Sequence, residues 1–167
     1  ELTDIKSAPY PGASVVPEYC RATYDRRLLV GETKESVLAP IQELLDKLMA
    51  EDPQLKAKVS YAVGKEQCYT GNEITGERFF PGWLYDEKDE FVQDVKKELE
   101  GMGYTPEITQ YNFCTNGSHY AGEAGIKTFG LGPSKENLAH TVNEYIEIDQ
   151  LTKVTDCYYG VMKALLK

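Results

Sequence analysis

Residues 129–146 read FGLGPSKENLAHTVNEYI, and this stretch decides how the rest of the chain is interpreted. A short apolar strand that begins at Ile126 is expected to break at the glycines and the proline of this stretch. The loop that follows carries His140 and leads into a final helix. In α/β proteins, loops at strand ends commonly carry the reactive groups. Because imidazole titrates near neutral pH and is the commonest protein metal ligand, the sequence makes His140 a candidate site residue.

His140 has two interpretations that the residues alone leave open. A lone histidine in a loop is usually a surface residue, because a metal site needs three or four ligands. The chain has no H-x-D or H-E-x-x-H motif, and its other histidine, His119, is expected on a short helix as a surface or supporting residue. If His140 is a ligand, its partners are expected outside these residues, although three glutamates could lie nearby: Glu123, Glu136 and Glu144.

Composition and charge bound the class of protein. The chain has 167 residues, enough for one ordinary domain or two small ones, and its 41% hydrophobic and 27% charged residues are typical of a soluble globular protein. The net charge of −9 argues against a nucleic-acid partner, which requires a Lys/Arg surface. No apolar run reaches the roughly 18–20 residues that span a bilayer, so no membrane association is expected.

The four cysteines are far apart and form no C-x-x-C pair. They are Cys20, Cys68, Cys114 and Cys157. We expect small, buried, free thiols in a reduced compartment, which places the protein in the cytoplasm.

The first part of the chain predicts two strands, a helix and a further strand. Alternating polarity indicates strands over 2–6, 18–30 and 58–64, and apolar residues three and four apart indicate a helix over 35–50. Pro40 is expected in the first turn of this helix, where a missing N–H costs least. The order β-β-α-β is most of a split ferredoxin-like unit. The missing first strand and helix favour a piece of a longer polypeptide.

The second part predicts helices that alternate with strands. A Gly/Pro-rich linker over about 69–85 separates two predicted domains, 1–68 and 69–167. The patterns then indicate, in order, a helix over 87–100, a strand over 107–114, a short helix over 118–124, a strand over 126–131 and a helix over 147–166. Such alternation implies a parallel sheet with helices packed on it. The predicted fold class is therefore α/β with an α+β first domain.

Residues 115–118 read Thr-Asn-Gly-Ser and follow the first predicted strand of the second part. If the two strands are parallel, this turn and the His140 loop lie at the same edge of the sheet. The turn would then offer backbone N–H groups, hydroxyls and an amide to a small substrate. The simpler interpretation is that Asn116 and Gly117 only form a tight turn, and composition alone favours it.

Arg27 belongs to the charged run Asp25-Arg26-Arg27 on the strand predicted over 18–30. A guanidinium can bind a substrate carboxylate with two hydrogen bonds. Alternating charges along a strand are more often a solvated face, and the residues leave both interpretations open.

Several motifs together resemble a known family. The run TYDRR at 23–27, followed by GET at 31–33 and a helix, is similar to the lid, or dimerisation, domain of the co-catalytic zinc metallopeptidases and deacylases of family M20. The segments FCTNG at 113–117, GLGP at 130–133 and AHTVNEY at 139–145 resemble the end of its catalytic domain. The family includes glutamate carboxypeptidase, acetylornithine deacetylase and succinyl-diaminopimelate desuccinylase, and the combination is most similar to the selenium-metabolism hydrolase branch.

This resemblance implies roles for individual residues. His140 matches the C-terminal histidine that binds one of two zinc ions, and Thr115, Asn116 and Gly117 match the loop that contacts the substrate near the metals. Arg27 matches a lid-strand arginine that faces the substrate. The family's H-x-D pair, bridging aspartate and catalytic glutamates are expected before the point where this chain begins, so no catalytic residue is expected here. Asn116 departs from the Gly-Thr-Asp sequence of many members, which leaves the substrate open.

The implied fold is a partial ferredoxin-like lid followed by the C-terminal α/β part of a zinc-exopeptidase-like catalytic domain. The resulting hypothesis is a fragment of a zinc-dependent amide hydrolase that acts on small N-acyl amino acids or dipeptide-like compounds through a metal-activated water. The isolated chain is expected to be inactive, because one imidazole cannot hold two metals, and a homodimer through the lid is expected. The alternative is a non-catalytic α/β binding or dimerisation module. A cysteine or serine hydrolase is disfavoured, because no nucleophile elbow is recognisable near His140.

Overall fold

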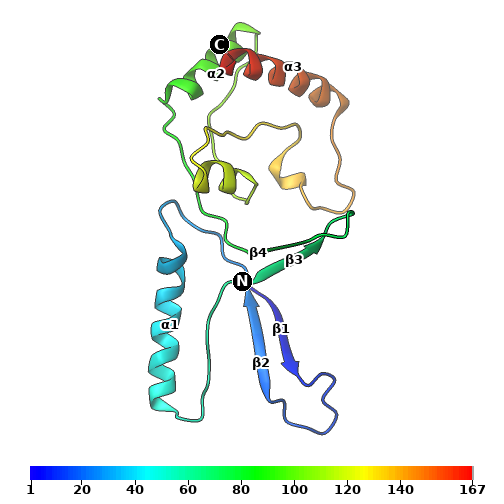
Figure 1. The fold of residues 1–167 in the computed structure, drawn as a ribbon. Helices are drawn as coiled ribbons and strands as arrows, with labels where there is room; N and C mark the ends of the chain where they lie inside the picture. Colours follow the sequence, from blue (N-terminus) through cyan, green and yellow to red (C-terminus); the bar gives the residue numbers. More distant parts are fainter. Residues whose placement is uncertain (167) are drawn as a thin grey trace. The chain divides into compact units, whose positions relative to one another are not determined.

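The computed structural model describes residues 1–166 and divides into two compact units, Glu1–Gly82 and a second one that begins at Trp83. Figure 1 shows the helices and strands of both units. The division falls inside the segment 69–85, which the sequence predicts as a linker. The two domain limits expected from the sequence stay a prediction.

The first unit consists of two antiparallel hairpins and one long helix (Figure 1). Strand β1 (Leu2–Ala8) pairs with β2 (Tyr19–Tyr24), and β3 (Val63–Gln67) pairs with β4 (Glu73–Glu77). Helix α1 (Lys34–Glu51) lies between the two hairpins in the chain. The prediction of a mixed fold of helices and strands is confirmed.

The strands do not join into the single ferredoxin-like sheet that their order predicts. Among the described residues, β1 and β2 form one two-stranded sheet, and β3 and β4 form another. The second hairpin is closed locally, since the N–H of Cys68 donates to the carbonyl of Asn72 at 2.8 Å and Gly71 adopts a φ of +87°. Because a hairpin needs only such short-range closure, it forms without a long crossover. Strand β4 therefore occupies the predicted linker, and the strand predicted over 58–64 begins only at Val63.

Helix α1 begins slightly earlier than its apolar pattern predicts, because its N-terminus is capped. Thr33 Oγ1 accepts the N–H of Ser36 at 3.2 Å, and Ser36 Oγ accepts the N–H of Thr33 at 2.9 Å. This reciprocal pair satisfies two of the N–H groups that the start of a helix leaves open. Pro40 consequently lies beyond the first turn of α1, so the prediction that it lies within that turn is wrong.

The apolar stripe of α1 is largely exposed. Val37 is buried, whereas Ile41, Leu44 and Leu48 are 40%, 56% and 39% exposed. The whole chain exposes 13579 Å², whereas two separate globular units that share its 18.8 kDa mass would together expose about 10,000 Å². The excess is of the size that large protein interfaces bury. Surfaces such as the α1 stripe are therefore available for contact with further polypeptide.

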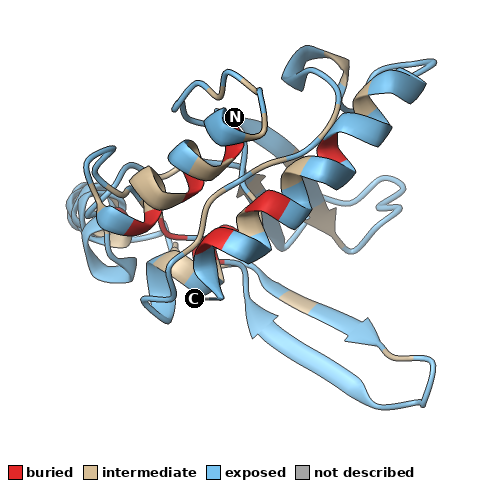
Figure 2. Cartoon of the chain, turned by 90° about the horizontal axis from the view of Figure 1, so that it is seen from above, coloured by how far each residue is buried: buried red, intermediate tan, exposed pale blue. Residues whose placement is uncertain are grey.

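The second unit is built on α2 (Glu90–Gly101), which packs against α3 (Ile148–Leu165). Both helices were predicted from their apolar periodicity, and both predictions are confirmed to within a few residues at each end. Their contact buries Val95, Leu99 and Ala164. The buried residues, red in Figure 2, lie mostly on helices, while the four strands are exposed or half-buried.

Gly160 leaves room for side chains at the contact between α2 and α3. A Cβ at this position would lie 2.6 Å from Sδ of Met102, so the Met102 side chain, which follows the end of α2, would have to shift. Lys163 of α3 forms an ion pair with Glu98 of α2, and this pair raises the pKa of Lys163. No helix within residues 1–166 is long and apolar enough to cross a membrane.

The parallel sheet predicted for the second unit is absent from its described residues, so this prediction is wrong. The segments 107–114 and 126–131 run as irregular chain, and some of their backbone groups form hydrogen bonds with side chains. The N–H of Asn112 donates to the carboxylate of Glu136 at 3.0 Å, and the carbonyl of Ile126 accepts a tyrosine hydroxyl at 2.7 Å. Side chains therefore bind some of these backbone groups, and no ladder of strand hydrogen bonds forms in the described part of the second unit.

The cysteines are free but more exposed than predicted. Cys20 and Cys114 are exposed, and Cys68 and Cys157 are half-buried. Cys20 lies on β2, whose sheet has only two strands, which explains its exposure. Cys157 packs beside the α2–α3 core, where burial raises the pKa of its thiol.

Candidate functional site

The Thr-Asn-Gly-Ser turn is held in one conformation by its own hydrogen bonds. The N–H of Gly117 donates to Thr115 Oγ1 at 3.1 Å, and the N–H of Ser118 donates to the carbonyl of Thr115 at 3.1 Å. The carbonyl of Asn116 accepts the N–H of His119 at 3.0 Å. These backbone groups are satisfied inside the turn, so what the turn offers to a ligand is mainly the amide side chain of Asn116.

The turn rests on an aromatic side chain of its own unit. A Cβ on Gly117 would lie 2.7 Å from Cζ2 of Trp83, a distance that real contacts do not reach, so the backbone here must be glycine. The next residue, Ser118, is 4% exposed, and its Oγ lies 3.7 Å from Sγ of Cys114. The turn is therefore anchored through Gly117 and Ser118, while Asn116 is exposed.

His119 belongs to a π-helical turn, Ser118–Glu123, which directly follows. Its Nδ1 lies 2.8 Å from Oε2 of Glu123, and both side chains are more than 40% exposed. Partly exposed pairs of this kind contribute little to stability, about 0–1 kcal/mol. Glu123, considered above as a neighbour of His140, is thus engaged with His119.

His140 is exposed, and its backbone is held by a glutamate four residues along. Its N–H donates to Oε2 of Glu144 at 2.9 Å. Its φ is +61°, a left-handed conformation that residues other than glycine rarely adopt. Of the three glutamates considered as neighbours, Glu144 therefore contacts His140, while Glu136 accepts the N–H of Asn112. The imidazole is accessible to a ligand.

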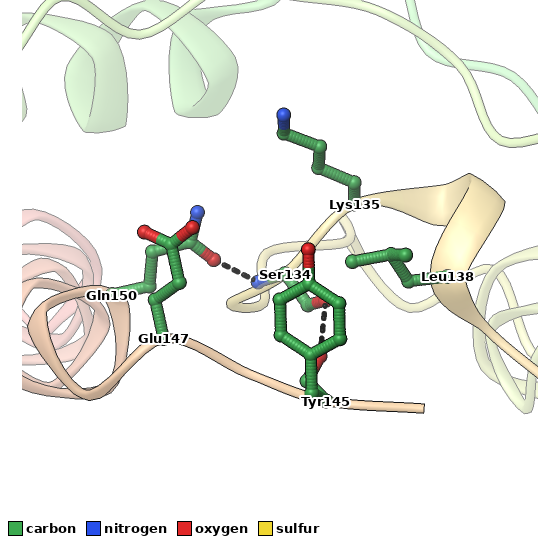
Figure 3. Close-up of a pocket in the computed structure, with 6 residues that line it drawn as sticks. All are labelled: Ser134, Lys135, Leu138, Tyr145, Glu147 and Gln150. Carbon is green, nitrogen blue, oxygen red and sulfur yellow. Dashed lines mark hydrogen bonds between the residues drawn. The ribbon is translucent and has the colours of Figure 1, made fainter. Parts of the chain in front are cut away.

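The loop that carries His140 is closed at its base by Ser134 (Figure 3). The N–H of Ser134 donates to Oε1 of Gln150 at 2.6 Å, and its Oγ donates to the carbonyl of Tyr145 at 3.3 Å. A cavity of about 20 Å³ lies beside these bonds and is lined by Ser134, Lys135, Leu138, Tyr145, Glu147 and Gln150. A cavity of this size holds about one water molecule, so it is too small for a substrate.

The residues 1–166 do not form a complete metal site. Within them, no group of three or more His, Cys, Asp and Glu side chains is arranged to hold a metal ion. Zinc in proteins takes three or four protein ligands. The role of His140 as a metal ligand therefore stays a prediction, in which the other ligands come from elsewhere.

The candidate residues are divided between the two units. His140 and the turn from Thr115 to Gly117 belong to the second unit, but the common sheet edge that was expected to align them does not exist among the described residues. Arg27 belongs to the first unit, where its Nη1 lies 2.8 Å from each carboxylate oxygen of Asp25. Arg27 is thus engaged in a surface ion pair that a substrate carboxylate would have to replace. Its contact with a substrate stays a prediction.

Sequence reasoning missed the residues that close the His140 loop. Ser134 follows Gly-Pro and adopts a φ of +76°, and a Gly-Pro pair is a turn signal that could have drawn attention to it. Nothing in the pattern singles out Gln150, because a polar residue in the first turn of a helix is ordinary.

The chain matches the profile of Peptidase family M20/M25/M40 over residues 16–164. The chain therefore belongs to this family, and the resemblance drawn from its motifs is confirmed.

Three relatives are similar to the chain, and the names of two of them state an activity. The chain is 34% identical over 135 residues to the protein YgeY of Escherichia coli (strain K12), an alignment that covers 80% of this chain and 32% of YgeY. It is 33% identical over 128 residues to the N-formyl-4-amino-5-aminomethyl-2-methylpyrimidine deformylase of Halalkalibacterium halodurans. This alignment covers 74% of this chain and 28% of the deformylase. It is 25% identical over 154 residues to the succinyl-diaminopimelate desuccinylase of Hydrogenovibrio crunogenus. This alignment covers 92% of this chain and 35% of the desuccinylase. The chain thus spans about a third of the length of these curated relatives. No solved structure gives a significant match.

Proposed function

We propose that the chain is part of a zinc-dependent amide hydrolase that removes an acyl group from a nitrogen of a small molecule. In this proposal His140 supplies one metal ligand. Asn116, on the turn from Thr115 to Gly117, contacts the substrate, and Arg27 binds its carboxylate. The bound metal would polarise the amide carbonyl and activate a water molecule.

The observation that carries this proposal is the family match over residues 16–164. Two relatives have names that describe removal of an acyl group, a formyl group in one and a succinyl group in the other. We propose small N-acyl amino acids or dipeptide-like compounds as the substrate class, and the removal of acyl groups that these two names describe supports this proposal. An exposed imidazole and an exposed carboxamide on two loops of one unit are compatible with binding such a compound.

The isolated chain is proposed to be inactive. One accessible imidazole cannot hold the two metal ions expected for the complete enzyme, and the described residues offer no further donor cluster. The large exposed surface also supports a chain that works together with additional polypeptide.

Removal of the metal from the intact protein, as encoded by its gene, tests the proposal. The protein should hydrolyse N-formyl or N-succinyl amines, lose this activity after dialysis against a chelator, and regain it with zinc. The release of free amine measures each step, and a chelator-treated sample given magnesium serves as the control. Absence of hydrolysis of any N-acyl amine, or hydrolysis that survives complete metal removal, would contradict the proposal.

A homodimer through the first unit is a second proposal, which the exposed stripe of α1 favours. Replacing Leu44 with glutamate would place a charge in a dry interface, and we expect this change to convert a dimer of the intact protein into a monomer in sedimentation analysis. Glu43→Gln, on the same helix but outside the stripe, is the control. A wild-type protein that sediments as a monomer at all concentrations rules the dimer out. The non-catalytic alternative would gain support if this dimer formed but the intact protein hydrolysed nothing.

A further inference from the structure

Unusual backbone conformations are concentrated around His140. Three of the four non-glycine residues with positive φ among residues 1–166 lie in the loop from Ser134 to Tyr145, namely Ser134 at +76°, His140 at +61° and Asn143 at +62°. Such conformations persist only where the surrounding structure holds them. The loop therefore needs contacts that hold these residues in conformations that their backbones do not favour.

Ser134 makes two such contacts at the base of the loop (Figure 3), in addition to the bond from the His140 N–H to Glu144. Its N–H donates to Oε1 of Gln150 at 2.6 Å, which ties the start of the loop to α3. Its Oγ donates to the carbonyl of Tyr145 at 3.3 Å, which ties the start of the loop to its end. Gln150 lies in the first turn of α3, and α3 is itself packed on α2. The loop is thus closed and attached to the packed pair of helices α2 and α3.

We propose that Gln150 is a positioning residue for His140. By accepting the Ser134 N–H, its side chain keeps the loop closed and presents the imidazole in one place. The inference rests on the proposed function, in which His140 binds a metal. Groups that orient a metal ligand contribute to metal affinity, although they do not touch the metal.

Two variants of Gln150 distinguish the contribution of its hydrogen bond from that of its side-chain size. Gln150→Leu keeps the size of the side chain but removes the acceptor, which leaves the Ser134 N–H without its protein partner. In the intact protein, we expect amide hydrogens of residues 134–145 to exchange about five- to tenfold faster. We expect zinc, measured by competition with a chelator, to bind about 10- to 100-fold more weakly. Gln150→Glu keeps an oxygen acceptor and should restore both quantities to within about threefold of the wild type.

Gln93→Leu is the matched control, because Gln93, like Gln150, lies in the first turn of a helix and bonds to a backbone group. Its side chain donates to the carbonyl of Glu87 at 2.6 Å. It should change neither the exchange of the His140 loop nor the zinc affinity. Unchanged exchange in Gln150→Leu, unchanged zinc affinity, or a loss that Gln150→Glu does not restore would overturn the inference. If the wild-type protein itself binds no zinc, the proposed role of His140 fails. The exchange measurement, made without metal, then still decides whether Gln150 fixes the loop.

Discussion

Replacing His140 with alanine in the intact protein should lower kcat/KM for an N-acyl amine by roughly 100-fold or more. Even partners that only orient a metal ligand cost about 10–100-fold in affinity or activity when they are removed, so loss of a ligand itself should cost at least as much. The variant should also retain less zinc than the wild type after dialysis. Metal analysis and initial-rate measurements on the same preparations test both parts.

His119→Ala is the matched control for this prediction, because it removes the other histidine of the chain. Its imidazole pairs with Glu123 on a partly exposed turn, so the loss of that contact should change activity by no more than about fivefold and leave zinc content unchanged. Loss of zinc in His119→Ala with full retention in His140→Ala would reverse the assignment of the two histidines.

The second large effect is expected on the stability of the second unit, when a residue of its core is truncated. Leu99 is 4% exposed and lies between α2 and α3, next to Val95 and Ala164. Leu99→Ala should therefore cost about 2–5 kcal/mol, because the cavity cannot collapse between two packed helices. A unit of this size has only roughly 4–13 kcal/mol of stability in total, so the change removes a large share of it. The midpoint of thermal unfolding of this unit should fall by roughly 10–30 °C.

Leu151→Ala tests whether the loss of stability in Leu99→Ala arises from the burial of Leu99 or from any leucine-to-alanine change in these helices. Leu151 lies on α3 but is 52% exposed, so its truncation should change stability by about 0.5 kcal/mol or less. Calorimetry, or the exchange protection of the α2 amides, measures both variants. Similar effects of the two substitutions would show that the α2–α3 contact is not the core of this unit.

The helices of this protein could be predicted from sequence because their signals are local. The periodicity of apolar residues located α1, α2 and α3 to within a few residues of their observed ends. The cap formed by Thr33 and Ser36 explains why α1 starts where it does, and it could have been read from the same residues.

The sheets could not be predicted in this way, because strand pairing depends on contacts between distant segments. The segments 107–114 and 126–131 have the composition of strands, yet they form no strand ladder in the described residues, and side chains bind some of their backbone groups. The order of strands in the first unit matched a known motif, but order does not determine whether two hairpins share a sheet.

The roles of the candidate site residues stay predictions, whereas the geometry predicted for them is wrong. His140 and the turn that contains Asn116 were identified from motifs, and the family match supports the resemblance that assigned their roles. The argument that placed them at one sheet edge was wrong, because that sheet is not formed in the described residues. The hydrogen bond from Ser134 to Gln150 was not predicted, since it joins two polar residues whose types carry no distinctive signal.

The central claim is that this chain contributes one metal ligand to a site that other residues complete. Zinc analysis of the isolated 167-residue chain, after equilibration with zinc and exhaustive dialysis, tests it most directly. We predict far less than one zinc ion per chain, because a single imidazole does not retain zinc against dialysis. One or more tightly held zinc ions per chain would contradict the claim.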